Sequence, residues 1–171
     1  MQGAENSLNI VAFEKLPVLP YQKSCVTIGN FDGVHKGHQF IINEIVQRGF
    51  SMEMPTVVIT FYPNPADLFG HVQEPFYLTT PEEKTAQLKA LGVDEVITFR
   101  FDRDFAGLSP EVFLQALKDK LGLQVLMVGD DFALGKNRVG TIPVIRQIGE
   151  KIGFSLEALH PVEFGGREIS S

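Results

Sequence analysis

The chain has 171 residues, of which 44% are hydrophobic and 21% are charged. This length suits one compact domain with a core of its own and is short for two. A net charge of −6 argues against a broad nucleic-acid surface, which needs clustered lysine and arginine. The sequence contains no apolar run near the roughly 20 residues that cross a bilayer, so we expect neither nucleic acid nor a membrane as a partner.

The N-terminus lacks the basic start and apolar core of a secretory signal, and Cys25 is the single cysteine. One cysteine cannot form an internal disulfide, so we expect a cytoplasmic protein. Cys25 lies in an apolar run, where a buried and inert thiol is the favoured interpretation and a reactive thiol the alternative.

Strands and helices alternate along most of the chain. The segment from Asn9 to Phe13 is weakly strand-like, in a tail expected to lie against the domain. Strands are then predicted at 24–28, 56–61, 94–101, 123–129 and 154–160, and helices at 36–48, 80–92, 109–122 and 141–152. Thr80 and Glu83 match a capping box with Pro81 at the first helical position, and Gly122 is placed to end a helix.

This alternation, with several strands apolar throughout, predicts a doubly wound, Rossmann-like α/β fold with a parallel sheet covered on both faces. Ligands of such sheets bind beyond the carboxyl ends of the strands. Three segments follow those ends, at 29–35, 61–65 and 129–135. We expect them to converge on one crevice.

The stretch SCVTIGNFDGVHKGHQ joins the first apolar strand to a helix that begins near His35. A helix N-terminus after a glycine turn favours phosphate, because its N–H groups are unpaired and the macrodipole attracts negative charge. His35 and His38 share one face of the first turn. The two histidines could bind a metal, although the sequence shows no evident third ligand, or they could be plain surface or core histidines. A third interpretation is that their imidazoles donate hydrogen bonds to phosphate oxygens. The nearby Gly29, Gly33 and Gly37 favour this third interpretation, because they let the backbone approach a ligand closely.

The run GNFDGVHKGHQ resembles the first signature of the FMN adenylyltransferase module of bacterial FAD synthetases, nucleotidyltransferases with a His-x-Gly-His motif. The similarity continues, in order, through FYPNP, LTTPEEKTAQLKALGVDEV, FDRDFAGLSPEVF, VGDDFALGKNRVG and the final EISS. It implies one nucleotidyltransferase-type domain over residues 1–171. It also implies synthesis of FAD and pyrophosphate from FMN and ATP with Mg²⁺, by in-line attack of the FMN phosphate and without a covalent enzyme intermediate.

The resemblance assigns His35 and His38 to binding the ATP phosphates and stabilising the transition state. Asp131 is assigned to positioning phosphate or magnesium, with a loop carboxylate that caps a turn as the alternative. No protein-held metal site is implied. The residues expected to bind ATP are Gly29, Asn30, Phe31, Asp32, Gly33, Gly37, Ser170 and Ser171.

The flavin is expected at the loop after the second long strand, where prolines hold the chain extended and aromatic rings can stack. The residues assigned to it are Phe61, Pro63, Asn64, Pro65 and Phe132. A plain edge loop with packed aromatics is the alternative, and Phe132 also suits the core. Lys136 and Arg138 give the 130–140 loop positive charge, suited to phosphate or to solvent.

In the family, the closing Ser-Ser continues as x-Arg-Ile-Arg, and a riboflavin kinase module normally follows in the bifunctional proteins. Neither lies within the 171 residues. We therefore expect an FMN adenylyltransferase, standing alone or as the N-terminal part of a bifunctional FAD synthetase. The alternatives are a related nucleotidyltransferase with another phosphorylated acceptor, and an inactive nucleotide- or flavin-binding module.

Overall fold

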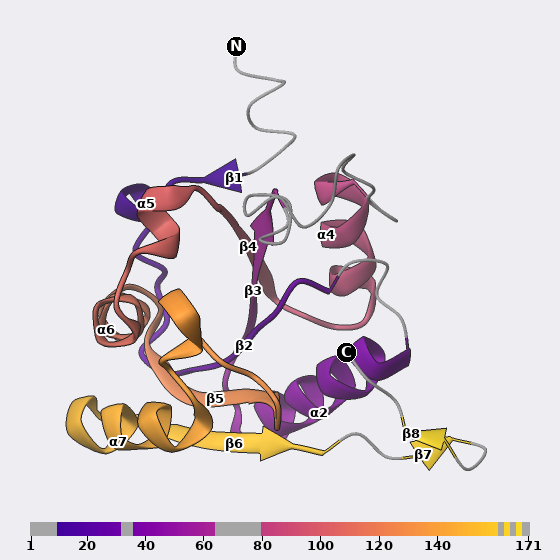
Figure 1. Cartoon of the computed structure of the whole chain (residues 1–171). Coiled ribbons are helices and arrows are strands. Elements are labelled where there is room, and N and C mark those ends of the chain that lie inside the picture. Colours follow the sequence, from indigo (N-terminus) through magenta and orange to yellow (C-terminus); the bar gives the residue numbers. More distant parts are fainter. Residues whose placement is uncertain (1–9, 32–35, 64–79, 161–162, 165–166, 169–171) are drawn as a thin grey trace.

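The computed structural model describes residues 10–31, 36–63, 80–160, 163–164 and 167–168, and in this part of the chain six strands form one parallel sheet (Figure 1). Their order is β1-β4-β3-β2-β5-β6, and β7 and β8 form a separate antiparallel pair. The strands are β1 (Ile10–Val11), β2 (Ser24–Ile28), β3 (Thr56–Tyr62), β4 (Glu95–Arg100), β5 (Leu123–Gly129), β6 (Ser155–Leu159), β7 (Glu163–Phe164) and β8 (Arg167–Glu168). The predicted parallel sheet is confirmed.

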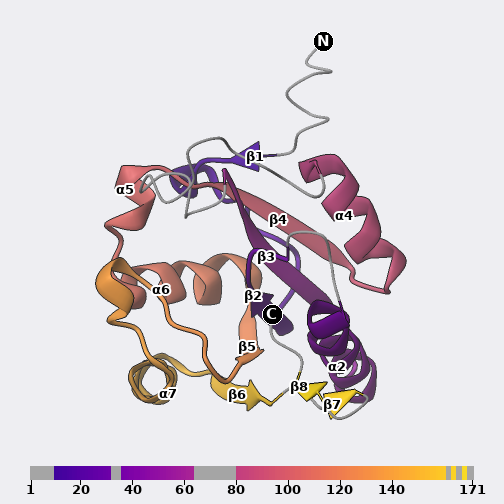
Figure 2. The ribbon, with the colours of Figure 1, turned by 45° about the vertical axis from the view of Figure 1, so that its right-hand side comes forward.

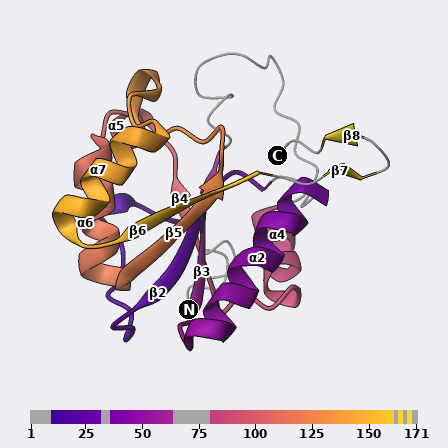
Figure 3. The same ribbon diagram turned by 90° about the horizontal axis from the view of Figure 1, so that it is seen from below.

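Helices cover both faces of this sheet. They are α2 (Lys36–Met52), α4 (Pro81–Ala90), α5 (Arg103–Ala106), α6 (Pro110–Leu121) and α7 (Ile142–Ile152), with two 3-10 turns, η1 (Phe13–Lys15) and η3 (Lys136–Arg138). Figure 3 shows α2 and α4 on one side of the strands and α6 and α7 on the other. The predicted double winding is therefore confirmed.

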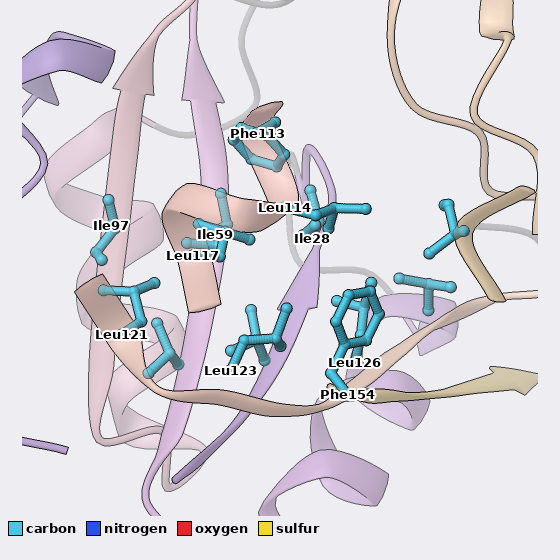
Figure 4. Close-up of a cluster of buried hydrophobic side chains, with 14 of the residues drawn as sticks. Ile28, Ile59, Ile97, Phe113, Leu114, Leu117, Leu121, Leu123, Leu126 and Phe154 are labelled. Carbon is cyan, nitrogen blue, oxygen red and sulfur yellow. The ribbon is translucent and has the colours of Figure 1, made fainter. Parts of the chain in front are cut away.

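Alternate residues of the strands supply the two cores, because successive side chains point to opposite faces. Val26 and Ile28 of β2 pack in the cluster that α6 and α7 cover, part of which Figure 4 shows. Cys25 faces the other way and packs with Ile45 of α2. Its side chain is fully buried, which confirms the predicted burial, and burial raises the pKa of its thiol to about 11, in keeping with an inert thiol.

Most predicted element ends match the structure. The Thr80 capping box is present, with both of its hydrogen bonds, and α6 ends at Gly122 in the left-handed conformation. Helix α2 was expected to end before Gly49, a residue that usually ends helices. The helix instead runs on to Met52 and contains Gly49. The role of Gly49 is to allow close packing, since a Cβ at this position would lie 2.5 Å from the Thr56 methyl group.

The N-terminal segment is tied to the domain. β1 pairs with β4 at the sheet edge (Figure 2), so the weak strand signal marks a real but two-residue strand. Leu16 is buried, and the Leu19 N–H donates to the Lys120 carbonyl at 2.8 Å. The sequence did not predict α5, β7 or β8, because elements of two to four residues leave no periodic pattern.

The order of the strands creates a switch point at β2. From β2 the chain moves to β3 and β4 on one side, then returns to place β5 and β6 on the other side. The connections that leave the carboxyl ends of β2 and β5 therefore diverge to opposite faces. This is the position at which open α/β sheets bind ligands.

No described helix is long and apolar enough to cross a membrane.

Candidate active site

The carboxyl ends of β3, β2 and β5, where the sequence predicts a crevice, stand side by side. The Gly29 N–H, directly after β2, donates to the Ile59 carbonyl of β3 at 3.0 Å. On the far side of β2, Val26 pairs with Leu126 of β5. The described parts of the three segments singled out in the sequence therefore meet at one sheet edge, while residues 32–35 and 64–65 lie outside the described residues.

Phe31 anchors the chain just after β2. Its backbone is left-handed, with φ of 52°, and its side chain is 2% exposed. The ring packs in a cluster with Ile42 of α2 and Leu88 of α4, and a Cβ on Gly29 would lie 3.0 Å from two ring atoms. The residue expected to line the ATP site thus buries its side chain in the core.

His38 lies in the first turn of α2 and is 6% exposed. Its imidazole meets the Phe31 ring edge-on, with 5.1 Å between ring centres and 73° between ring planes. The ring is therefore held beside the turn that follows β2. Its expected partner His35 lies outside the described residues, as do Asp32, Gly33, Ser170 and Ser171; Gly37 lies within α2.

Asn30 shows a contact that the sequence did not predict. Its backbone carbonyl accepts hydrogen bonds from the Lys84 ammonium at 2.6 Å and from the Thr60 hydroxyl at 2.9 Å. Lys84 is only 8% exposed and comes from α4, more than fifty residues further along the chain. A lysine in a helical sequence predicts an exposed side chain, so no pattern pointed to this contact.

Phe61, expected at the flavin, belongs to a group of aromatic rings at the end of β3. It is half-buried and meets Phe101 and Phe105 edge-on, with centre distances of 5.8 Å and 5.7 Å. Pro63 is also half-buried and follows a cis peptide bond. Asn64 and Pro65 lie outside the described residues. The rings form an apolar group, and two of its members, Phe101 just after β4 and Phe105 of α5, were not assigned to the site from the sequence.

The loop after β5 is closed on itself. Leu134 and Gly140 pair through two backbone hydrogen bonds, and the Arg138 guanidinium donates to the Asp131 carbonyl at 2.9 Å. Arg138 therefore fixes the loop, while the Asp131 side chain is exposed. Phe132 is half-buried against the core, in keeping with the core alternative.

A side-chain contact between the Asp130 carboxylate and the His160 Nδ1 joins the ends of β5 and β6. A second contact joins the same points, because the Asp130 N–H donates to the Leu159 carbonyl at 2.9 Å. No local pattern predicted this pair, since thirty residues separate its members. No group of three or more His, Cys, Asp or Glu side chains among the described residues is arranged to hold a metal ion.

The fold is that of an open parallel α/β protein with a switch point between β2 and β5, the position at which such sheets bind ligands. A model of the FAD synthetase family matches residues 20–171. The bifunctional riboflavin kinase/FMN adenylyltransferase of Escherichia coli K12 is 40% identical over 152 residues, which make up 88% of this chain and 49% of that protein. The protein of the same name from Pseudomonas fluorescens is 38% identical over 154 residues, 89% of this chain and 49% of that one.

The chain belongs to the FAD synthetase family. It spans about half the length of these curated relatives. A solved structure titled macrolide-efflux protein from Streptococcus pneumoniae has a TM-score of 0.78 and 24% identity, and the match covers 95% of this chain and 53% of that one. That likeness shows a shared fold.

Proposed function

We propose that this protein is an FMN adenylyltransferase, which transfers AMP from ATP to FMN and yields FAD and pyrophosphate. The observation that carries the proposal is the family match over residues 20–171, which contains all the segments that meet at the switch point. The relatives' names include this activity beside riboflavin kinase. We assign only adenylyl transfer to the matched residues.

In this reaction an oxygen of the FMN phosphate bonds to the α-phosphorus of ATP while the bond from that phosphorus to the bridging oxygen of pyrophosphate breaks. ATP enters as its Mg²⁺ complex. The chemistry needs alignment and neutralisation of charge rather than a protein nucleophile. A glycine turn, a helix N-terminus and imidazole donors supply both.

His38, together with His35, is assigned to the ATP phosphates. Three features support this role for His38: its place in the first turn of the 17-residue helix α2, its contact with Phe31, and its low exposure, which strengthens electrostatic interactions. The backbone of residues 29–33, with Gly37, Ser170 and Ser171, completes the proposed ATP site. Asp131 is assigned to phosphate or magnesium positioning, since its exposed carboxylate offers the oxygen ligands that Mg²⁺ prefers.

The flavin ring is assigned to the loop after β3, through Phe61, Pro63, Asn64 and Pro65, with Phe132 at its border. The half-buried rings around Phe61 support an apolar, stacking partner. A cytoplasmic location and the lack of nucleic-acid and membrane partners belong to the same proposal, and cell fractionation tests them.

The test incubates the full-length gene product with FMN, ATP and Mg²⁺ and separates the flavins by chromatography. We expect FAD in step with released pyrophosphate. His38→Ala should lower kcat on the order of 100-fold and change the FMN dissociation constant less than about twofold, whereas Gln47→Ala, an exposed position of the same helix, should match wild type.

Three results would count against the proposal. Pyrophosphate release with another phosphorylated acceptor, but not with FMN, would favour the related nucleotidyltransferase. Binding of ATP and FMN without any turnover would favour a binding module. Equal losses of kcat and flavin affinity in His38→Ala would refute the assignment of His38 to the phosphates.

A further inference from the structure

A buried lysine of α4 lies beneath the turn that follows β2. The Lys84 ammonium donates to the Asn30 carbonyl at 2.6 Å and to the Thr60 hydroxyl at 3.2 Å, and the Thr60 hydroxyl donates to the same carbonyl at 2.9 Å. Three elements, β2, β3 and α4, are thus joined at one carbonyl oxygen. Lys84 belongs to the segment LTTPEEKTAQLKALGVDEV, from which the proposed function assigns no ATP-binding or flavin-binding residue.

The stability of α4 does not explain a lysine at this position. Lys84 is the fourth residue of the helix, whose N-terminal end is fixed by the Thr80 capping box and favours negative rather than positive charge. Burying an ammonium group is also unfavourable, and the same helix face buries Leu88 completely. An apolar side chain would suit both the helix and the core, so the charge serves a partner outside the helix.

One such partner is the peptide that joins Asn30 to Phe31, whose carbonyl accepts from the Lys84 ammonium. In a trans peptide the carbonyl and the next N–H point in opposite directions. Because Lys84 and Thr60 hold the Asn30 carbonyl, the Phe31 N–H is directed away from them. Within the described part of the chain this N–H makes no hydrogen bond, although Phe31 is buried.

We propose that Lys84 is a positioning residue for adenylyl transfer, which orients the Asn30–Phe31 peptide so that its N–H faces the phosphates of ATP. The inference rests on the proposed function. Phe31 is left-handed and touches the His38 ring, so a rotated peptide would also displace the imidazole. Lys84 acts through this backbone rather than by touching the substrates.

The experiment compares Lys84→Met with Lys89→Met, which removes an exposed ammonium from the same helix. Lys84→Met should lower kcat about 10- to 100-fold, the effect of misplaced groups in a preorganised site. The FMN dissociation constant should change less than about twofold. Lys89→Met should match wild type in both.

A second measurement does not depend on turnover. In amide NMR spectra, addition of a non-hydrolysable ATP analogue should shift the Phe31 resonance of wild type and of Lys89→Met, and this shift should be lost in Lys84→Met. If wild type makes no FAD, the proposed function fails, while the NMR comparison still decides whether Lys84 orients the peptide.

Thr60 provides a smaller change at the same carbonyl. Thr60→Val, which removes the hydroxyl and keeps the shape, should lower kcat about 3- to 10-fold, and Thr60→Ser should restore it. This pair carries the test if Lys84→Met does not fold. Equal kinetics of Lys84→Met and Lys89→Met, an unchanged Phe31 shift, or a parallel loss of kcat and FMN affinity would overturn the inference.

Discussion

Replacing Phe31 with alanine should separate the stability of the core from the geometry of the site. The ring is 2% exposed and packs against Ile42 and Leu88, so its removal leaves a cavity between α2, α4 and the sheet. Deleting a buried phenylalanine costs about 3–5 kcal/mol of unfolding free energy. The left-handed backbone at Phe31 is strained for phenylalanine and alanine alike, so it does not change this figure.

The matched control is Leu88→Ala in the same cluster. Leu88 is fully buried on α4, and leucine-to-alanine changes in cores cost about 2–5 kcal/mol. The two variants should therefore lose similar stability. Phe31→Ala alone removes the ring that contacts His38, at 5.1 Å between centres, and the anchor of the turn after β2.

The assay has two parts. Urea unfolding gives the free energy of each variant, and turnover is measured at a temperature where both are folded. We expect Phe31→Ala to lose on the order of 100-fold in kcat, since misplaced phosphate ligands are expensive, and Leu88→Ala to stay within about threefold of wild type. A stability loss below about 1 kcal/mol for Phe31→Ala, or equal kcat values, would refute this reasoning.

Three further predictions concern stability. Gly122→Ala should lower the free energy of unfolding in urea by about 2–4 kcal/mol, because the φ of Gly122 is 69° and a Cβ would lie 2.5 Å from the Tyr21 carbonyl oxygen. The control is Gly107→Ala, where the nearest atoms are 3.6 Å from the new Cβ, and it should be neutral or stabilising. Thr80→Ala should lower the melting temperature through a loss of about 1 kcal/mol, and an unchanged value would contradict the observed cap. In the folded protein, burial raises the pKa of the Cys25 thiol to about 11, whereas in the unfolded chain a cysteine thiol has a pKa of about 8.5. Between these pH values the unfolded chain has lost a proton that the folded chain keeps, so unfolding free energy should fall by up to about 1.4 kcal/mol per pH unit. Cys25→Ala should flatten that fall; an identical slope would contradict it.

The sequence predicted the sheet because its information is local. Apolar strands such as Leu123–Gly129, the capping box at Thr80 and the stop at Gly122 are each set by neighbouring residues, and each appears as expected. Gly49 shows the limit of such signals. A glycine after a helical run reads as an end, yet here it allows α2 to approach Thr56, a contact that exists only in three dimensions.

The sequence predicted which strand ends meet, but not the contacts that support the turn after β2. The ends of β2, β3 and β5 could be located because parallel strands bring them together. Lys84 and Thr60 could not be found, since their link to Asn30 crosses 54 and 30 residues. Phe31 was assigned to the ATP site from its motif, and the motif did not show that the fold buries its side chain in the core.

The most direct measurement follows the phosphorus atoms of ATP. The full-length gene product is incubated with FMN, Mg²⁺ and ATP labelled at either the α- or the γ-phosphorus, and the products are separated. We expect α-label in FAD and γ-label in pyrophosphate, with inversion at a chiral α-phosphorus, as a single in-line transfer requires. Label from the γ-phosphorus in the flavin, retention at the α-phosphorus, or no label in any flavin would contradict it.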